Sequence, residues 1–411
     1  MKILSARLVA FSSLVLVTAA CTQSAPPPPA AAPPIAEATP AAPPVDTKAL
    51  AAKLVKSAAI KEGDIVGISG GLKDWQLLED LSVEVRKAGA FPLTTAGSDD
   101  LSRRMVTDVP EKYDSQKPAL DLKITEMVDA FIALDYIERD DLLAGVPASR
   151  LAARAAAAAP VGELAFKRNL RQVNLGNGLL PTAAAATRFG VPQDQLTKMY
   201  WSGVNTDYDK LQATATAVSA ALAAGKTVHI TNPNGTDVTA SIAGRHAFQS
   251  DGVISADDMK RGGAAVAVYL PAGESFISPV PGTAEGKIVA DHYFFQGQDV
   301  KGLSLTFAKG KITNMTATSG LDRLKALYDA ATAGKDELSF VDLGLNPDVQ
   351  VPAGSTLRTW VPAGMVTLGT GNNVWAGGAN TATFGFTAFL PGSTVEVDGK
   401  VLVKDGALQK Q

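Results

Sequence analysis

The sequence predicts a mixed α/β plus α+β fold: an N-terminal α/β domain with a parallel sheet, then a strand-rich, mainly antiparallel C-terminal domain. The first observation is a strand–helix–strand pattern with short turns that starts at residue 65, which is typical of a βαβ unit. The second is a change at Lys226, after which short runs of alternating hydrophobicity are separated by Asn, Gly and Pro. We therefore expect the α/β domain to span residues 46–224 and the strand-rich domain to span residues 225–411.

Local patterns place the elements of the N-terminal domain. The apolar run Ile65-Val66-Gly67-Ile68 is predicted to be a buried strand, and apolar residues at helical spacing among charges follow it. Gly89 ends that helix, and Phe91-Pro92-Leu93 begins another extended piece. Residues 129–135 supply a further buried strand. The predicted helices are residues 46–60, 74–88 and 147–159, with more helix between 181 and 224.

The C-terminal domain is predicted from short alternating runs between turn residues. These runs begin at Thr227 and continue almost to the end of the chain. One stretch with helical spacing, residues 319–333, interrupts them. The predicted strands after the first are residues 264–270, 287–295, 300–307 and 311–317, and strand-rich pieces are predicted at residues 355–361, 381–390 and 394–403.

The N-terminus has the layout of a secretory signal. Lys2 and Arg7 precede an uncharged stretch, residues 8–20, that is too short to span a bilayer as a helix. The stretch ends in Thr18-Ala19-Ala20-Cys21, which resembles the lipobox of bacterial lipoproteins. We expect residues 1–20 to be a signal peptide and Cys21 to be lipidated. The alternatives are an ordinary cleavable signal and a longer uncleaved anchor.

The segment after Cys21 is expected to be a tether. From Ala25 to Pro44 it is almost entirely Pro and Ala, which favours an extended spacer without a core. Residues 21–45 would then hold the folded part away from a membrane to which the acyl chains bind it. The expected location is lipid-anchored to the bacterial membrane, on the outer membrane facing the periplasm or the cell surface. Thr22 gives no acidic signal for retention at the inner membrane.

Composition narrows the function classes. The 411 residues carry a net charge of −3, and Lys and Arg form no basic stripe interleaved with aromatic residues, so nucleic acid is not an expected partner. Cys21 is the only cysteine, so no internal disulfide can form. Three histidines, His229, His246 and His292, leave few options for metal chemistry.

One short motif suggests a serine hydrolase. Gly67-Ile68-Ser69-Gly70-Gly71 satisfies the G-x-S-x-G pattern between a predicted strand and a predicted helix, as in a nucleophile elbow. His246 or His292 would have to act as the base. The alternative is a Gly-rich turn that leaves a buried strand.

A set of segments, in order over nearly the whole chain, resembles the aminopeptidase T/aminopeptidase S family of leucyl-type metallo-aminopeptidases. The most extended segment is Pro271-Ala272-Gly273-Glu274-Ser275-Phe276-Ile277-Ser278-Pro279. The others include Gly63-Asp64-Ile65-Val66, Leu180-Pro181-Thr182-Ala183, Asn234-Gly235-Thr236-Asp237, Leu343-Gly344-Leu345-Asn346-Pro347, Gly377-Gly378-Ala379-Asn380 and Val397-Asp398-Gly399-Lys400. The resemblance implies two domains, a possible homodimer, and hydrolysis of N-terminal peptide bonds with two divalent metal ions such as zinc or cobalt.

The resemblance also implies a ligand set, which this sequence keeps at one position. Glu274 retains the glutamate of the Gly-Glu segment. The family's other ligands are a glutamate, a histidine, a tyrosine, a histidine and an aspartate. Their positions are occupied here by Phe340, Met365, Asn372 (or a neighbour of it), Gly385 and Thr387. No histidine follows His292, so no shift of the alignment supplies the missing imidazoles. We therefore expect no metal cofactor.

Three hypotheses follow. The first is a catalytically degenerate family member that binds a peptide or protein ligand in the old cleft, made more apolar by Phe340, Met365, Phe384 and Phe386. The second is a working hydrolase that uses Ser69 or a rebuilt metal site around Glu274 and His292; the other donors for such a site are Asp291, Asp257 and Asp258. The third is a structural envelope lipoprotein in which the cleft has collapsed.

Overall fold

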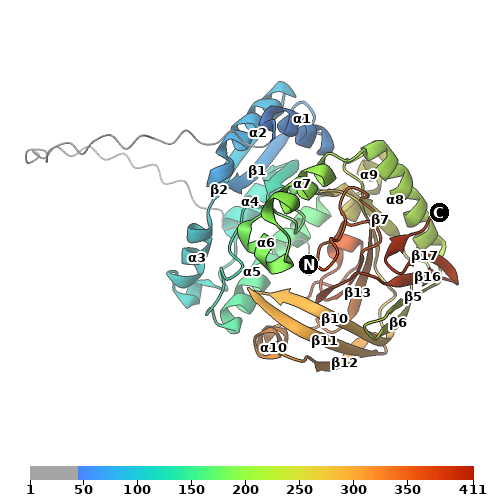
Figure 1. Cartoon of the computed structure of the whole chain (residues 1–411). Coiled ribbons are helices and arrows are strands. Elements are labelled where there is room, and N and C mark those ends of the chain that lie inside the picture. Colours follow the sequence, from blue (N-terminus) through green and yellow to red (C-terminus); the bar gives the residue numbers. More distant parts are fainter. Residues whose placement is uncertain (1–44) are drawn as a thin grey trace, which may run out of the picture.

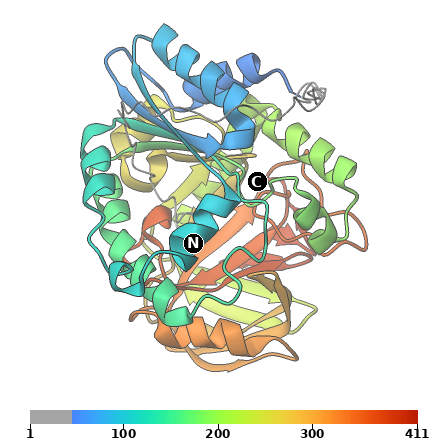
Figure 2. The ribbon, with the colours of Figure 1, turned by 90° about the vertical axis from the view of Figure 1, so that its left-hand side faces the viewer.

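The computed structural model describes residues 45–411, and residues 1–44, with the predicted signal, Cys21 and most of the tether, lie outside the described residues. One parallel and two antiparallel sheets form the framework (Figure 1). Figure 2 shows the blue parallel strands at the top and the orange and red antiparallel strands below them. The predicted fold class is confirmed.

The parallel sheet has the strand order β2-β1-β3-β4-β8. Its inner strands carry fully buried apolar residues such as Val66, Ile68 and Ile132, because both faces of a parallel sheet are covered. The last strand, β8, pairs with β4 although it comes from beyond residue 225. The five strands are β1 (Ile65–Gly71), β2 (Phe91–Gly97), β3 (Ala130–Leu134), β4 (Arg171–Leu175) and β8 (Ala267–Leu270).

Helices from the N-terminal part surround this sheet. α2 packs on β1 and β2, and its buried residues are Leu77, Leu78, Leu81 and Val85, as expected for an amphipathic helix. α1 packs on α2, and α4 packs on α5. The helices are α1 (Thr47–Ser57), α2 (Trp75–Lys87), α3 (Asp99–Thr107), α4 (Ala119–Met127) and α5 (Ala148–Lys167).

The helix predicted over residues 147–159 is longer in the structure. α5 continues through Pro160 to Lys167. Proline removes one helical hydrogen bond and leaves the carbonyl four residues earlier without a donor. That residue, Ala156, is exposed, as is Pro160, so water can satisfy the carbonyl and the helix need not end there.

The helical stretch predicted between residues 181 and 224 is three helices. Gly190, at φ 63°, ends the first of them in the left-handed conformation, and Pro192 directly precedes the second. The third is capped by Asp207, whose side chain accepts from the backbone N–H of Lys210 at 3.2 Å. These helices are α6 (Ala183–Phe189), α7 (Gln193–Val204) and α8 (Tyr208–Ala224).

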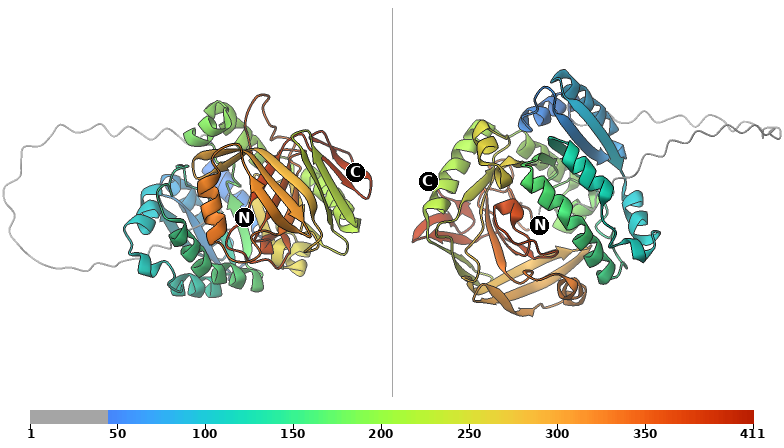
Figure 3. Two further views of the ribbon diagram at one scale, coloured as in Figure 1. Left: turned by 90° about the horizontal axis from the view of Figure 1, so that it is seen from below. Right: turned by 180° about the vertical axis from the view of Figure 1, so that it is seen from behind.

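The larger antiparallel sheet has eight strands in the order β12-β11-β10-β6-β5-β16-β17-β18. Its long hairpin, β10–β11, turns between Phe295 and Gln298 (Figure 3). The strands are β5 (Thr227–Asn232), β6 (Thr236–Ser241), β10 (Glu285–Phe295), β11 (Gln298–Ala308), β12 (Lys311–Thr316), β16 (Thr394–Val397), β17 (Lys400–Lys404) and β18 (Ala407–Leu408).

The smaller antiparallel sheet is buried between the other layers. Every residue of β9, β13 and β14 is buried, because α8 packs on β7 and β9 while β10 of the larger sheet contacts β15. The strand order is β15-β14-β13-β9-β7. The strands are β7 (Ala247–Ser250), β9 (Glu274–Ile277), β13 (Leu338–Gly344), β14 (Val366–Thr370) and β15 (Thr387–Leu390), and the remaining helices are α9 (Ala256–Arg261) and α10 (Leu321–Ala330).

Three predicted strands differ from the structure. Residues 355–361 form no strand, because their backbone bonds to a helix end: the N–H of Thr356 donates to the carbonyl of Phe189 at 2.9 Å. Only Ala267–Leu270 of the stretch 264–270 is a strand, and only Thr387–Leu390 of the stretch 381–390. Among residues 45–411, no helix combines the length and apolar character needed to cross a membrane.

Candidate functional site

Glu274 lies at the carboxyl ends of two parallel strands. It begins β9 and is 0% exposed. The side-chain amide of Asn177, just after β4, donates to Oε2 of Glu274 at 3.4 Å and to the carbonyl of Pro271, just after β8, at 2.9 Å. This edge of an α/β sheet is where ligands commonly bind.

Phe340 lies inside a group of aromatic rings that we call the tryptophan cluster, formed by Phe340, Trp360, Trp375 and Phe389. The ring centroid of Phe340 is 4.9 Å from that of Trp375 and 5.9 Å from that of Trp360. Trp360 is in turn 5.1 Å from Phe389. Because Phe340 is 0% exposed, its position is part of the packed core.

The residues at the other metal-ligand positions also pack in the core or form turns. Met365, directly before β14, is buried. The side-chain oxygen of Asn372 accepts from the backbone N–H of Val374 at 3.2 Å, as in a turn. A Cβ atom at Gly385 would lie 1.9 Å from the carbonyl oxygen of Thr370, so this backbone has no room for a side chain there. Thr387 is half-buried in β15.

These residues do not fit a pair of zinc or cobalt ions. A phenyl ring and a glycine supply no donor atom, and a thioether is a soft ligand that suits copper(I) better than either ion. Within residues 45–411, no group of three or more His, Cys, Asp and Glu side chains is placed to hold a metal ion. Glu274 is thus the one carboxylate that remains at the positions implied by the resemblance.

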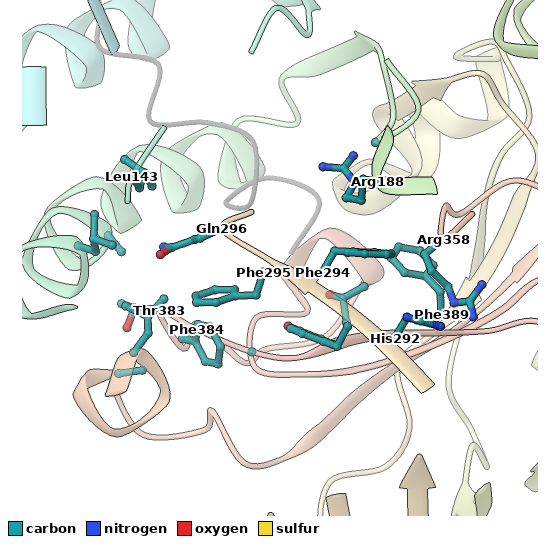
Figure 4. Close-up of a pocket in the computed structure, with 18 of the residues that line it drawn as sticks. Leu143, Arg188, His292, Phe294, Phe295, Gln296, Arg358, Thr383, Phe384 and Phe389 are labelled. Carbon is teal, nitrogen blue, oxygen red and sulfur yellow. The ribbon is translucent and has the colours of Figure 1, made fainter. Parts of the chain in front are cut away.

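A cavity of about 440 Å³ lies beside two of these positions. Gly385 and Thr387 line it, as does Trp360 of the tryptophan cluster. Other walls come from α5, from the end of α6 and from β10, so the cavity lies where the two parts of the chain meet (Figure 4). Its volume falls in the range of small-molecule sites.

His292 faces this cavity and is held by a carboxylate. Its Nδ1 atom lies 2.7 Å from Oδ2 of Asp299, on the neighbouring strand β11. The ring stacks on Phe294 at a centroid distance of 6.0 Å. Next to it, burial raises the pKa of the Tyr293 phenol, which therefore stays neutral.

The comparisons with known proteins decide the family. Residues 47–343, more than half of the chain, match the family described as thermophilic metalloprotease (M29). The chain belongs to the M29 family. Glu274 and Phe340 lie inside the matched residues, whereas Met365, Asn372, Gly385 and Thr387 lie beyond them. No curated protein sequence matches the chain.

Two solved structures share the fold of this M29 member. The wild-type AmpT structure from Thermus thermophilus superposes with a TM-score of 0.67 at 18% identity, covering 89% of this chain and 99% of that chain. The 2,5-dihydroxypyridine dioxygenase from Pseudomonas putida KT2440 superposes with a TM-score of 0.57 at 15% identity, covering 90% of this chain and 99% of that chain. At these identities the likeness establishes the fold alone.

The G-x-S-x-G motif does not form an elbow. All five residues, Gly67 to Gly71, lie within β1, and Ser69 is 4% exposed. A nucleophile elbow needs a sharp turn that presents the serine hydroxyl, and a residue within an extended strand has none. His246 is exposed, and His292 is bonded to Asp299 and faces a cavity that Ser69 does not line.

The other candidate metal ligands have structural roles or lie at the surface. Asp258 completes a capping box with Ser255 at the start of α9, and Asp257 pairs with Lys260 at 2.9 Å. Asp291 is exposed on β10. The structure does not group them with Glu274 into a metal site.

Two arginines of the cavity were missed by sequence reasoning. Arg188 reaches it from the end of α6, and Arg358 reaches it from the irregular segment wrongly predicted as a strand. Neither has a local motif. The pairing of His292 with Asp299 could have been found, because a turn at Gln296-Gly297 places these two residues diagonally across a hairpin.

Proposed function

We propose that this M29 protein is a catalytically degenerate family member, attached to a bacterial membrane through lipidated Cys21, whose cleft binds a ligand without hydrolysing peptides. The observation that carries the proposal is the chemistry of the ligand positions. Phe340 and Met365 are core residues, and Gly385 has no room for a side chain. A reaction that needs two metal ions to polarise a carbonyl and activate water has only Glu274 left at these positions.

The cleft itself supports a binding role. If the lost site had collapsed, aromatic side chains would have filled the space; instead a cavity of about 440 Å³ remains beside Gly385 and Thr387. Such a volume, lined mainly by apolar groups with a few polar ones, is typical of ligand sites. A purely structural role would not require this space.

The test is metal content together with aminopeptidase activity. We expect the full chain to hold no stoichiometric metal after incubation with zinc, cobalt or manganese, and to cleave no leucyl or arginyl substrate, because too few donors converge. Glu274→Gln should behave as the unchanged chain does in both assays. Stoichiometric metal together with turnover that Glu274→Gln abolishes would overturn the proposal and favour a rebuilt metal site.

The lipid anchor is tested separately. Expressed in a bacterium with its N-terminus intact, the chain should incorporate radiolabelled palmitate and sediment with membranes. Cys21→Ser should abolish the label and release the protein, because the remaining signal is too short to span a bilayer. Thr22→Ser, which leaves the cysteine in place, is the control. Palmitate incorporation that persists in Cys21→Ser would contradict this anchor.

A further inference from the structure

The cavity contains one cation that forms no ion pair with a carboxylate of the described residues. Three of its lining side chains can carry positive charge: Arg188, His292 and Arg358. Arg188 pairs with Asp140, and His292 pairs with Asp299. For Arg358, no carboxylate of residues 45–411 lies within 4.0 Å of the guanidinium.

The guanidinium of Arg358 uses only part of its hydrogen-bonding capacity within the described residues. Its Nη1 donates to the carbonyl of Leu357 at 2.9 Å, whereas its Nε is buried without a hydrogen-bond partner among the described residues. Burial lowers the pKa of Arg358, and the nearby charges of Asp291 and Asp299 oppose that shift. Arginine nevertheless keeps its charge in proteins, so the cavity holds a fixed cation with unused donors.

The rest of the lining is apolar. Figure 4 shows a row of aromatic side chains that runs from Phe384 and Phe295 to Phe294 and Phe389, with Arg358 at the Phe389 end. The rings of Phe295 and Phe384 meet edge to face at 6.4 Å. α5 adds small side chains such as Ala155 to the lining. A ligand that fills this space must present an apolar body to the rings.

We propose that the cavity binds a small carboxylic acid with an apolar, aromatic or aliphatic, body, whose carboxylate pairs with Arg358. Arginine offers two parallel donors that match the two oxygens of a carboxylate, and the pair gains strength when water is excluded. The apolar body removes aromatic surface from water, which supplies the remaining affinity. This inference rests on the proposed function, since it assigns a ligand class to the cleft.

The charges and the size favour an acid over a peptide. A peptide N-terminus would bring a second cation next to Arg358, while the two carboxylates nearest to His292 and Arg188 are already paired. A polypeptide segment would also bring amide groups into a space lined mainly by apolar side chains, where unpaired polar groups are costly. A ligand with one carboxylate on an apolar body adds neither a second cation nor unpaired amide groups.

The test is calorimetric titration of the full chain with 3-phenylpropanoate, indole-3-acetate and octanoate, each against its own neutral amide. We expect at least one acid to bind with a Kd below about 1 mM and its amide to bind at least about tenfold more weakly. Arg358→Gln should weaken the acid by a similar factor, whereas Arg104→Gln, an exposed arginine of α3, should not. Ala155→Phe, which narrows the cavity, should weaken acid and amide alike.

The outcomes separate this inference from the proposed function. If no acid binds, or if each amide binds as well as its acid, the ligand assignment is wrong even where the metal and aminopeptidase assays remain negative. If an acid binds but Arg358→Gln leaves its Kd unchanged, the carboxylate pairs elsewhere and the role of Arg358 is wrong. Metal-dependent hydrolysis of peptides would instead contradict the proposed function, whether or not an acid binds. The comparison of acid with amide needs no variant, so it holds even if Arg358→Gln misfolds.

Discussion

Phe340→Glu, which restores the residue type that the resemblance implies at this position, is expected to destabilise the protein by more than about 4 kcal/mol. The side chain of Phe340 is 0% exposed and packs against Trp375 and Trp360. A carboxylate there loses its hydration and finds aromatic rings instead of donors or metal ions. Chemical denaturation followed by tryptophan fluorescence measures the change directly.

The control for this variant is Phe340→Leu, which removes volume without adding charge. We expect it to cost about 1–2 kcal/mol through imperfect packing. The two variants should also differ in their response to pH. Burial raises the pKa of a folded-state carboxyl above the unfolded value of about 4.3, so the extra cost of the glutamate is present at neutral pH and shrinks as pH falls toward 4. A neutral-pH stability within about 1 kcal/mol of the unchanged chain would show that position 340 can still accept a ligand side chain.

Gly385→Ala is expected to cost about 3 kcal/mol or more. The new Cβ would lie 1.9 Å from the carbonyl oxygen of Thr370 and 2.9 Å from the Cα atom of Gly371. Both are backbone atoms, at the last residue of β14 and the residue after it, so no side-chain rotation relieves the overlap and the β14–β15 connection must shift. Thermal unfolding of the purified chain measures the effect.

Gly162→Ala is the matched control for this substitution. Gly162 lies within α5, and a Cβ atom there would meet nothing within 4 Å. Because alanine favours helix over glycine, this variant should be as stable as the unchanged chain or more stable by up to about 1 kcal/mol. If Gly385→Ala were equally harmless, the backbone could accommodate a side chain at position 385, and a histidine ligand there would be sterically possible.

Together these two predictions describe how the ligand positions differ from a metal site. Phe340 is now part of the hydrophobic core, and Gly385 now allows two backbone segments to approach closely. Reintroducing the metal-binding residue types one at a time should therefore destabilise the protein before it restores metal binding. Gly385 lines the cavity, and other parts of its wall come from α5 and β10.

Local sequence patterns determined the elements and the fold class. Apolar residues at helical spacing among charges predicted the helix α2, because a helix brings every third or fourth residue to one side. Of this apolar set, Leu77, Leu78, Leu81 and Val85 are buried, whereas Trp75 and Val83 are exposed. The alternating runs after Lys226 predicted antiparallel strands for a similar reason. The loss of metal-binding residue types was also visible in the sequence, since ligand chemistry depends on side-chain identity at each position.

Tertiary structure alone decided three matters. It placed Ser69 inside a strand, although its motif resembles an elbow. It bonded the backbone of residues 355–361 to the end of α6 and not to a sheet. This segment carries Arg358, which lines the cavity. It also showed which of the three basic side chains of the cavity pair with a carboxylate. Periodicity reports which residues are buried, whereas pairing and cavity shape depend on contacts between segments far apart in the chain. Such contacts have no local signal.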